Sequence, residues 1–358
     1  MELHNTQKNI NTQPLSTHRV FNNWNVVAKG WYLVCESKKL KVSSVNSFNI
    51  NGQSIAIFRD GHGKVHAMDG YCAHMGVDLG IGKVINNNLR CFFHHWQYDK
   101  NGDCVHIPAQ KEIPKKACLK GYRTSEKYGH IWVYPSKNGP DDVLEIPALE
   151  GVDIVSRAGK SYKRKCHYHI TMINGIDPQH LSTVHGINIK MDINIKEDTS
   201  NRIDIELRGE VPATNIKEKI WKYVLGNNYA YSMKYADGTL AALTTMKDVK
   251  LFNKFKIIPE LYMLFAYKSD GLQNTIVNTI FVTKKRKGLF GPLKSHFILW
   301  ITSQLLKVLQ GEDGEVYENI RFKTDCLLPI DAPVAKYIKY INGLAVSKWS
   351  RDTKHYQK

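Results

Sequence analysis

Two short cysteine–histidine pairs constrain this chain more than any other feature. Cys72 and His74 form a C-x-H pair in the segment GYCAHMGVDLG, and Cys91 and His94 form a C-x-x-H pair in the segment RCFFHHWQYDKNG. Two thiolates and two imidazoles at these spacings can hold a [2Fe-2S] cluster, with sulfur ligands on one iron and nitrogen ligands on the other. Each pair follows an extended run and lies among turn-forming residues, which predicts two loops at the tips of β-hairpins. The sequence therefore predicts a domain that transfers electrons.

A structural zinc site is the alternative interpretation, because zinc accepts the same ligand types. Structural zinc sites more often pair like with like, whereas each loop here supplies one cysteine and one histidine, and this favours the mixed arrangement called a Rieske cluster. His95 is a second candidate ligand beside His94. A longer gap after Cys91 would change the reach of the loop, so we prefer His94.

The composition is that of a globular protein. At 358 residues the chain is long enough for two domains, each with its own core. It has no uncharged apolar run long enough to span a membrane, and residues 1–20 lack the apolar centre of a signal peptide, which predicts a flexible tail there. The other cysteines show no disulfide framework, and this predicts reduced thiols in a cytoplasmic protein. They are Cys35, Cys104, Cys118, Cys166 and Cys326.

The chain is strongly basic, with 50 Lys and Arg against 33 Asp and Glu and a formal net charge of +17. Such an excess favours an acidic partner through long-range steering. Nucleic acid is not favoured, because no binding module is visible beyond the short run TKKRKG at residues 283–288. An acidic ferredoxin, or a flavin or iron–sulfur reductase, fits an electron-transferring domain better. The basic residues 284–287 of this run lie next to Leu289, Phe290 and Leu293 and suit contact with a membrane surface, but the sequence alone does not favour that contact.

The pattern of strands changes along the chain. Residues 21–140 contain short extended runs separated by Gly, Asn and Asp turns, which predicts a small all-β domain. The segment SKNGPDD at residues 136–142 predicts a linker. Residues 141–358 contain longer alternating runs with helical stretches before and after them, which predicts an antiparallel sheet with helices. We therefore expect an α+β protein with two domains in series.

A second candidate metal site lies in the segment NGIDPQHLSTVHG, which contains Asp177, His180 and His185. His185 follows His180 by five residues, so the two imidazoles can meet on one ion only if the helix ends or distorts between them. Gly186 is a plausible stop. Two histidines and a carboxylate, with other positions open, form the facial triad of non-heme Fe(II) chemistry. Asp177 could supply that carboxylate, but its proximity in sequence favours a supporting role.

The missing carboxylate is expected in residues 297–320, where Asp313 falls on a predicted apolar helical stripe. A carboxylate in such a place is costly unless a cation or hydrogen-bond donors meet it, and iron would do so. Glu312, Glu315 and Glu318 are rival candidates. The predicted stripe consists of Leu299, Leu306, Leu309, Asp313, Val316 and Ile320.

The two motifs together resemble those of the Rieske non-heme iron oxygenases, in particular their catalytic α-subunits, from about residue 22 to the C-terminal region. The family pattern N-x-x-D-x-x-H-x-x-x-x-H is matched by Asn174, Asp177, His180 and His185. The resemblance implies a Rieske domain followed by a helix-grip catalytic domain of the START/Bet v 1 type, with mononuclear Fe(II) bound by the two histidines and Asp313.

The resemblance also implies a homotrimer, in which the cluster of one chain approaches the iron of the next and Asp177 bridges to His94 of the partner subunit. The layout is most similar to the ketosteroid hydroxylase and O-demethylase branches. One departure is the second cluster loop, where the family carries CPYHGW and this chain carries CFFHHW, so Phe92 replaces Pro and His95 replaces Gly. A residue with a side chain adopts positive φ less easily than Gly, which predicts a reshaped loop.

From these observations we expect a terminal oxygenase that uses O2 and relayed electrons to hydroxylate, desaturate or demethylate a small hydrophobic, aromatic or polycyclic substrate. The alternative is a Rieske electron carrier or redox sensor, which would need only the first domain. A zinc protein that binds nucleic acid is a third interpretation, favoured only by the basic charge. The apolar stretches FKIIPELYMLFAY and GLFGPLKSHFILWI either line a substrate pocket or belong to the core.

Overall fold

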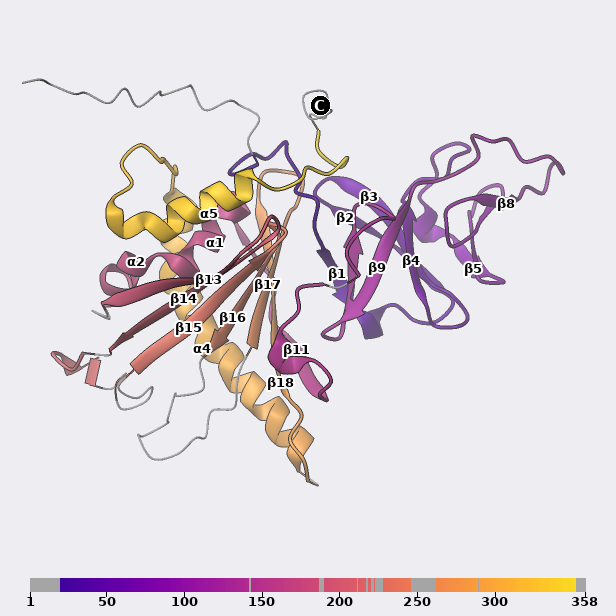
Figure 1. Cartoon of the computed structure of the whole chain (residues 1–358). Helices are drawn as coiled ribbons and strands as arrows, with labels where there is room; N and C mark the ends of the chain where they lie inside the picture. The colour runs from indigo at the N-terminus through magenta and orange to yellow at the C-terminus, as the bar shows by residue number, and fades with distance from the viewer. Residues whose placement is uncertain are drawn as a thin grey trace, which may run out of the picture.

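The computed structural model describes residues 20–141, 143–186, 190–210, 212–216, 218–219, 222, 228–245, 262–288 and 290–351. Within these residues the chain forms three antiparallel sheets and a set of helices, which confirms the α+β prediction (Figure 1). Nearly all of the predicted N-terminal tail and most of the stretch FKIIPELYMLFAY lie outside the described residues. None of the described helices is long and apolar enough to cross a membrane.

The first part of the chain contains a six-stranded sheet and a four-stranded sheet. The larger sheet has the order β1-β10-β9-β4-β3-β2 and consists of β1 (Tyr32–Glu36), β2 (Ser44–Ile50), β3 (Gln53–Arg59), β4 (Val65–Asp69), β9 (Gly121–Lys127) and β10 (His130–Tyr134). The smaller sheet consists of β5 (Lys83–Ile85), β6 (Asn88–Arg90), β7 (Gln97–Tyr98) and β8 (Cys104–His106). Short 3-10 turns lie at η1 (Ser37–Lys39) and η2 (Leu79–Ile81).

Local sequence sets the hairpins of this part. Asn51 and Gly52 join β2 to β3 with φ of 53° and 85°, the two positive values that a two-residue type I′ hairpin loop requires. Asn86 and Asn87 join β5 to β6 in the same way, with φ of 49° and 65°. Asn tolerates this conformation better than most residues with a side chain. The Asn86–Asn87 turn thereby fixes the register of β5 and β6, the strands next to the cluster-binding loops.

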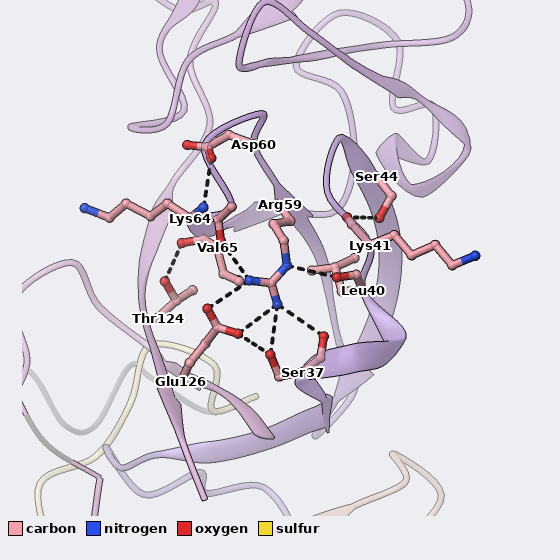
Figure 2. Close-up of polar contacts among 11 residues, drawn as sticks. Ser37, Leu40, Lys41, Ser44, Arg59, Asp60, Lys64, Val65, Thr124 and Glu126 are labelled. Carbon is pink, nitrogen blue, oxygen red and sulfur yellow. Dashed lines mark hydrogen bonds and ion pairs between the residues drawn. The ribbon is translucent and has the colours of Figure 1, made fainter. Parts of the chain in front are cut away.

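Arg59, at the end of β3, is the centre of a polar network that closes one end of the larger sheet (Figure 2). Its guanidinium donates to both carboxylate oxygens of Glu126 on β9, at 2.9 and 2.7 Å, and to the carbonyl oxygen of Leu40 at 2.9 Å. A further bond reaches the carbonyl of Ser37 in η1. The nearby guanidinium holds the pKa of Glu126 below its usual value. The network therefore links the connection between β1 and β2 to β9, the strand that lies across β4 from Arg59.

The second part of the chain is built on an eight-stranded sheet of order β11-β18-β17-β16-β15-β14-β13, with β12 also paired to β18. Its strands are β11 (Ile154–Ala158), β12 (Tyr162–Arg164), β13 (Met191–Asp198), β14 (Arg202–Glu210), β15 (Asn228–Ala236), β16 (Leu240–Thr245), β17 (Tyr262–Ser269) and β18 (Thr275–Lys284). The helices are α1 (Tyr168–Ile173), α2 (Pro178–Thr183), α4 (Gly291–Asn319) and α5 (Ala332–Asn342), with 3-10 turns η3 (Pro147–Leu149), η4 (Asn174–Ile176) and η5 (Pro329–Asp331).

The long helix α4 runs beside β11 and β18 (Figure 1), whereas α1 contacts β17 and β18, and α5 contacts β14. One face of the sheet is strongly apolar. In β14, for example, Ile203, Ile205 and Leu207 are fully buried while the residues between them are partly exposed, as expected for period-two alternation. This face packs against α1 and α5 and so supports the segment that carries the histidines.

The two parts of the chain exchange their terminal segments. Val20, Val26 and Ala28 pack in the core of the second part, whereas Trp349, near the C-terminus, packs among the buried residues of the first sheet. The Thr239 hydroxyl also donates to the Trp31 carbonyl at 2.8 Å across the boundary. The two parts are therefore held together by shared cores as well as by the linker.

Asp237 lies at this boundary and gives stability a predicted pH dependence. It is buried beside Trp31, its carboxylate accepts from Asn201 Nδ2 at 3.3 Å, and burial raises its pKa from 3.8 to about 6. Between these values the folded chain holds more protons than the unfolded chain, so the contribution of Asp237 to stability falls as pH rises from about 4 to about 6.

Replacing Asp237 with Asn should therefore stabilise the protein above about pH 6 by about 2 kcal/mol, because Asn carries no charge and still accepts the Asn201 bond. Asn also tolerates the positive φ of 56° at this position. Denaturant unfolding at about pH 5 and about pH 8 measures the effect, and the gain should shrink at the lower pH. An equal gain or loss at both pH values would contradict the assignment.

Candidate metal centres

The four predicted cluster ligands lie in two loops at one end of the smaller sheet. Cys72 and His74 lie in the loop from β4 to β5, and Cys91 and His94 lie in the loop from β6 to β7. Both loops close in the same way, because each cysteine N–H donates to the carbonyl five residues later, at 2.9 Å in both cases. The prediction of hairpin tips is confirmed for the second loop, which joins the paired strands β6 and β7, and is wrong for the first, because β4 and β5 belong to different sheets.

The donors of the two loops face one another. The side chains of Cys72 and Cys91 are buried, at 5% and 2% exposure, while those of His74 and His94 are exposed. The two imidazole centroids are 4.7 Å apart. Burial, together with the nearby Cys72 thiol, raises the pKa of Cys91. Two buried sulfurs and two exposed nitrogens suit a mixed-ligand [2Fe-2S] cluster, with its histidine side turned to the surface.

Two aromatic residues support these ligands. The Tyr98 hydroxyl lies 3.1 Å from Cys72 Sγ and accepts from the backbone N–H of Ala73 at the same distance. The ring of Trp96 stacks on His74 with a centroid separation of 4.6 Å and an interplanar angle of 6°. A hydroxyl that donates to a ligating sulfur is one of the means by which a protein sets the potential of such a cluster.

The departure at His95 does not reshape the loop as expected. His95 has φ of +58°, and Gly76, which occupies the same place four residues after the cysteine of the first loop, has φ of +72°. The second loop therefore keeps the left-handed turn that glycine usually supplies, and His95 takes the conformational cost of about 1 kcal/mol. This turn points the chain so that the ring of His94 faces that of His74.

Replacing His95 with Gly should therefore raise the stability of the metal-loaded protein by about 1 kcal/mol, because the turn is retained without a side chain. The cluster should keep its visible absorption, since His94 rather than His95 is the predicted ligand. A thermal melt and an absorption spectrum measure the two effects. Loss of the cluster in this variant would show that His95 is the ligand.

The second set of donors also converges. His180, His185 and Asp313 each offer a ligand atom, and these atoms lie within 4.8 Å of one another. His185 Nε2 is 3.3 Å from Asp313 Oδ1, and the centroids of the two imidazoles are 5.2 Å apart. The helix ends as the five-residue spacing requires: α2 stops at Thr183, and Gly186 follows with φ of +65°.

Neighbouring groups orient these donors. The Nδ1 of His180 lies 2.5 Å from the carbonyl oxygen of Asp177 and must donate to it, which leaves Nε2 free to bind a metal. The amide of Asn174 donates to Asp313 Oδ2 at 2.8 Å, which leaves Oδ1 facing His185. The side chain of Asp177 accepts from the backbone N–H of Gln179 at 2.9 Å and so caps α2. Asn174 and Asp177 thus position the donors.

The predicted stripe on α4 is wrong at Val316, which is 44% exposed. The buried face instead contains Leu299, Ser303 and Tyr317. Tyr317 lies four residues beyond Asp313, so the two side chains share one face of the helix. The rival carboxylates Glu315 and Glu318 are exposed, and Glu318 pairs with Lys165 at 3.0 Å. The side chains of Glu312 and Leu309 lie outside the described residues.

Arg164 is a neighbour of this centre that the sequence did not indicate. Its guanidinium donates to the carbonyl of Gln310 at 2.9 Å and lies over the rings of Tyr162 and Tyr317, at 4.8 and 6.0 Å from their centroids. A Cβ at Gly314 would lie 3.6 Å from the guanidinium, an ordinary van der Waals distance, so this turn of α4 packs directly against Arg164. The contact fixes the turn of α4 that carries Asp313.

Comparisons with known proteins identify a Rieske domain in the first part of the chain. The sequence model of the Rieske [2Fe-2S] domain matches residues 30–122. Cholesterol 7-desaturase nvd of Bombyx mori is 30% identical over 168 residues, which is 46% of this chain and 37% of the relative. The oxygenase component of 3-ketosteroid-9-alpha-monooxygenase of Rhodococcus rhodochrous is 27% identical over 164 residues, 44% and 42% of the two chains. The chain spans about two fifths of the length of these curated relatives.

Solved structures share the fold over a longer range. Dicamba monooxygenase bound to dicamba is similar with a TM-score of 0.64 and 17% identity, over 88% of this chain and 97% of that one. NdmB of Pseudomonas putida CBB5 is similar with the same TM-score and identity, over 88% and 90% of the two chains. The likeness in fold therefore extends over both parts of the chain.

Proposed function

We propose that this chain is the terminal oxygenase of a Rieske non-heme iron oxygenase system, on the strength of its Rieske [2Fe-2S] domain and of a two-part fold similar to those of dicamba monooxygenase and NdmB. It takes electrons from a reductase or ferredoxin and uses O2 to hydroxylate, desaturate or demethylate a hydrophobic substrate. The observation that carries the proposal is the convergence of His180, His185 and Asp313 in a chain that also has a Rieske domain. An electron carrier would have no use for this second centre.

The residues of the second centre fit mononuclear iron. Two neutral imidazoles and one carboxylate on one side of an ion are the donor set of the facial triad, and bound iron would supply the activation of O2. The chain itself holds the donors: Asp177 fixes the tautomer of His180, and Asn174 fixes the rotamer of Asp313. At the first centre, the two buried cysteines and the two exposed histidines supply the two sulfur and two nitrogen ligands that a Rieske cluster requires.

The arrangement of the two centres supports a relay between subunits. The loops that carry the cluster ligands lie beside β5 at one end of the molecule, while α2 lies at the opposite end (Figure 1). Electrons would therefore pass from the cluster of one chain to the iron of another within a homotrimer, through Asp177 and His94 of the partner subunit. Exposed apolar side chains surround the cluster loops and would be covered by this contact. They are Met75, Ile81, Phe92 and Phe93.

The N-terminal boundary of the Rieske domain is best placed at Gly30, because Val20, Val26 and Ala28 pack in the catalytic core and the Rieske match begins at residue 30. The catalytic domain then comprises these residues together with residues from about 141 onward. Its antiparallel sheet with α4 lying beside β18 is consistent with a helix-grip fold.

A cleft beside the cluster is the proposed docking site for an acidic electron donor. It has a volume of about 610 Å³ between the first sheet and the C-terminal segment, and Tyr71 in its wall directly precedes Cys72. Four lysines and one aspartate line it: Lys29, Lys120, Lys137, Lys348 and Asp69. A positive cleft next to the cluster favours a donor whose surface is negative.

Reversing two of these charges, Lys120→Glu and Lys348→Glu, should raise the KM for a plant-type [2Fe-2S] ferredoxin at least about tenfold at low salt, with little change in kcat at saturating ferredoxin. The exposed residues Lys41 and Lys160 lie outside the cleft and give a control with the same change of net charge when both are replaced by Glu. An equal rise in KM for the control pair would show that only the overall charge matters.

The function is tested by substrate-dependent turnover. The protein is loaded with cluster and Fe(II), supplied with a ferredoxin and reductase, and screened against sterols, ketosteroids and methoxylated aromatics for O2 uptake and for products by mass spectrometry. A hydroxylated, desaturated or demethylated product that is lost in the His185→Ala variant supports the proposal. Reduction of the cluster without substrate-dependent O2 uptake, in protein that holds iron at both centres, across the full screen would favour an electron carrier.

A further inference from the structure

The N-terminal half of α4 exposes a stripe of large apolar side chains. The stripe has five members, separated by three, four, three and one residues along the chain. On an α-helix these spacings place all five on one face, within about 100° around the axis. The stripe includes a tryptophan and two phenylalanines and extends for about 16 Å. Its members and their exposed fractions are Phe290 (63%), Leu293 (68%), Phe297 (59%), Trp300 (45%) and Ile301 (39%).

The fold does not account for this stripe. The opposite face of the same helix holds it to the sheet, through Ser295 and Leu299, which are fully buried, and Ser303, which is 6% exposed. Leu299 packs against Val155 of β11 and Phe281 of β18. A helix that already buries one face gains nothing in the monomer from a second apolar face in water, so the exposed face is suited to a partner.

Positive charge surrounds the stripe. Four exposed basic residues lie at the end of β18, where Lys284 is the last residue of the strand and Lys285, Arg286 and Lys287 follow it, and Lys294 flanks the stripe on the helix itself. A shallow hollow of about 470 Å³ lies between the basic run and the start of α4, and its lining includes Arg286, Lys287, Phe290 and Lys294. Asp153 is a nearby acid and lies 3.6 Å from Lys285. This end of α4 and the end of β18 project from the body of the molecule (Figure 1).

We propose that this surface, residues 284–287 with the stripe from Phe290 to Ile301, docks the protein on an anionic phospholipid membrane. Apolar and aromatic side chains enter the boundary between headgroups and acyl chains, with Trp300 at the depth that tryptophan prefers, while the cations meet lipid phosphates. Because the surface projects, a flat bilayer can reach it without a complementary groove. The same face of a second copy is a poor partner, since pairing would bring the two cationic runs together.

The test is co-sedimentation of the metal-loaded protein with vesicles. We expect binding to vesicles of phosphatidylcholine and phosphatidylglycerol in equal parts, and at least about tenfold weaker binding to phosphatidylcholine alone or in high salt. Leu293→Ser with Phe297→Ser should weaken binding at least about tenfold, because it removes two of the inserted side chains. Lys284→Gln with Lys287→Gln should weaken binding to the anionic vesicles by a similar factor and leave the stripe intact.

Leu272→Ser is the matched control. Leu272 is 80% exposed in the turn before β18, at the opposite end of that strand from Lys284, so this variant should bind as the wild type does. Absorption of the cluster and the far-ultraviolet spectrum check that each variant is folded, and vesicle binding requires no turnover, so it is independent of the proposed oxygenase activity. Wild-type protein that stays in the supernatant with both vesicles would overturn the proposal. So would stripe variants that bind vesicles normally but change the molar mass in light scattering, which would identify a contact between protein chains.

Discussion

Replacing Asp313 with Ala should remove the mononuclear iron and leave the Rieske cluster in place. Asp313 supplies the only carboxylate among the three converging donors of the described residues, and two imidazoles alone form a weaker site for Fe(II). The iron content should fall from about three to about two atoms per chain, with unchanged cluster absorption. Substrate-dependent turnover should fall at least about 100-fold, because loss of a ligand exceeds the loss of a supporting hydrogen bond.

Glu318→Ala is the control for this experiment, since Glu318 is an exposed carboxylate on the same helix and pairs with Lys165. It should keep its iron and its activity, because an exposed ion pair contributes little. Asn174→Ala should have an effect between those of Asp313→Ala and Glu318→Ala. Its affinity for iron should be about tenfold to 100-fold weaker than that of the wild type, since Asp313 would lose the donor that orients it. If Asp313→Ala retained the full iron content, the ligand would be a different carboxylate. Zinc at the cysteine pairs, and no absorbing cluster, would support the zinc interpretation.

The sequence was most informative where spacing alone fixes geometry. The two cysteine–histidine pairs predicted two similar loops, and the structure shows the same closing hydrogen bond in each. The five-residue gap between His180 and His185 required the helix to end between them, and Gly186 marks that end. The alternation of residues in the strands gave the α+β class. In each case the information lies within a few residues of chain.

Features that depend on tertiary packing could not be found in this way. Arg164 reaches the turn that carries Asp313 from a strand far away in sequence, and no local pattern links the two. The buried face of α4 is set by its contact with β11 and β18, so the predicted stripe was wrong at Val316, and Phe297 and Trp300 are exposed rather than in a core or pocket. At His95 the sequence indicated strain correctly, but the neighbouring turn imposes the backbone conformation despite it.

Replacing Asp177 with Asn should leave both metal centres and the fold intact and nearly abolish turnover. Asn caps a helix about as well as Asp, so the bond from Gln179 N–H and the start of α2 are kept, and stability should change by less than about 0.5 kcal/mol. The backbone carbonyl that fixes His180 is also unchanged. What is lost is the negative charge that the proposed relay uses to accept from His94 of the partner subunit, so turnover should fall at least about 100-fold.

Single-turnover measurements make this prediction specific to electron transfer. In the variant, a pre-reduced cluster should be oxidised at least about 100-fold more slowly in the presence of substrate and O2, although its reduction by ferredoxin is unchanged. Asp177→Ala should show the same defect together with a loss of about 1 kcal/mol of stability, because the cap is also removed. Asp331→Asn is the matched control, since Asp331 also contacts α2 through Gln179 Nε2 at 2.7 Å and should keep normal cluster oxidation. Wild-type turnover in Asp177→Asn would exclude a bridging role, and loss of mononuclear iron from that variant would mean that Asp177 serves to hold the site rather than to connect it.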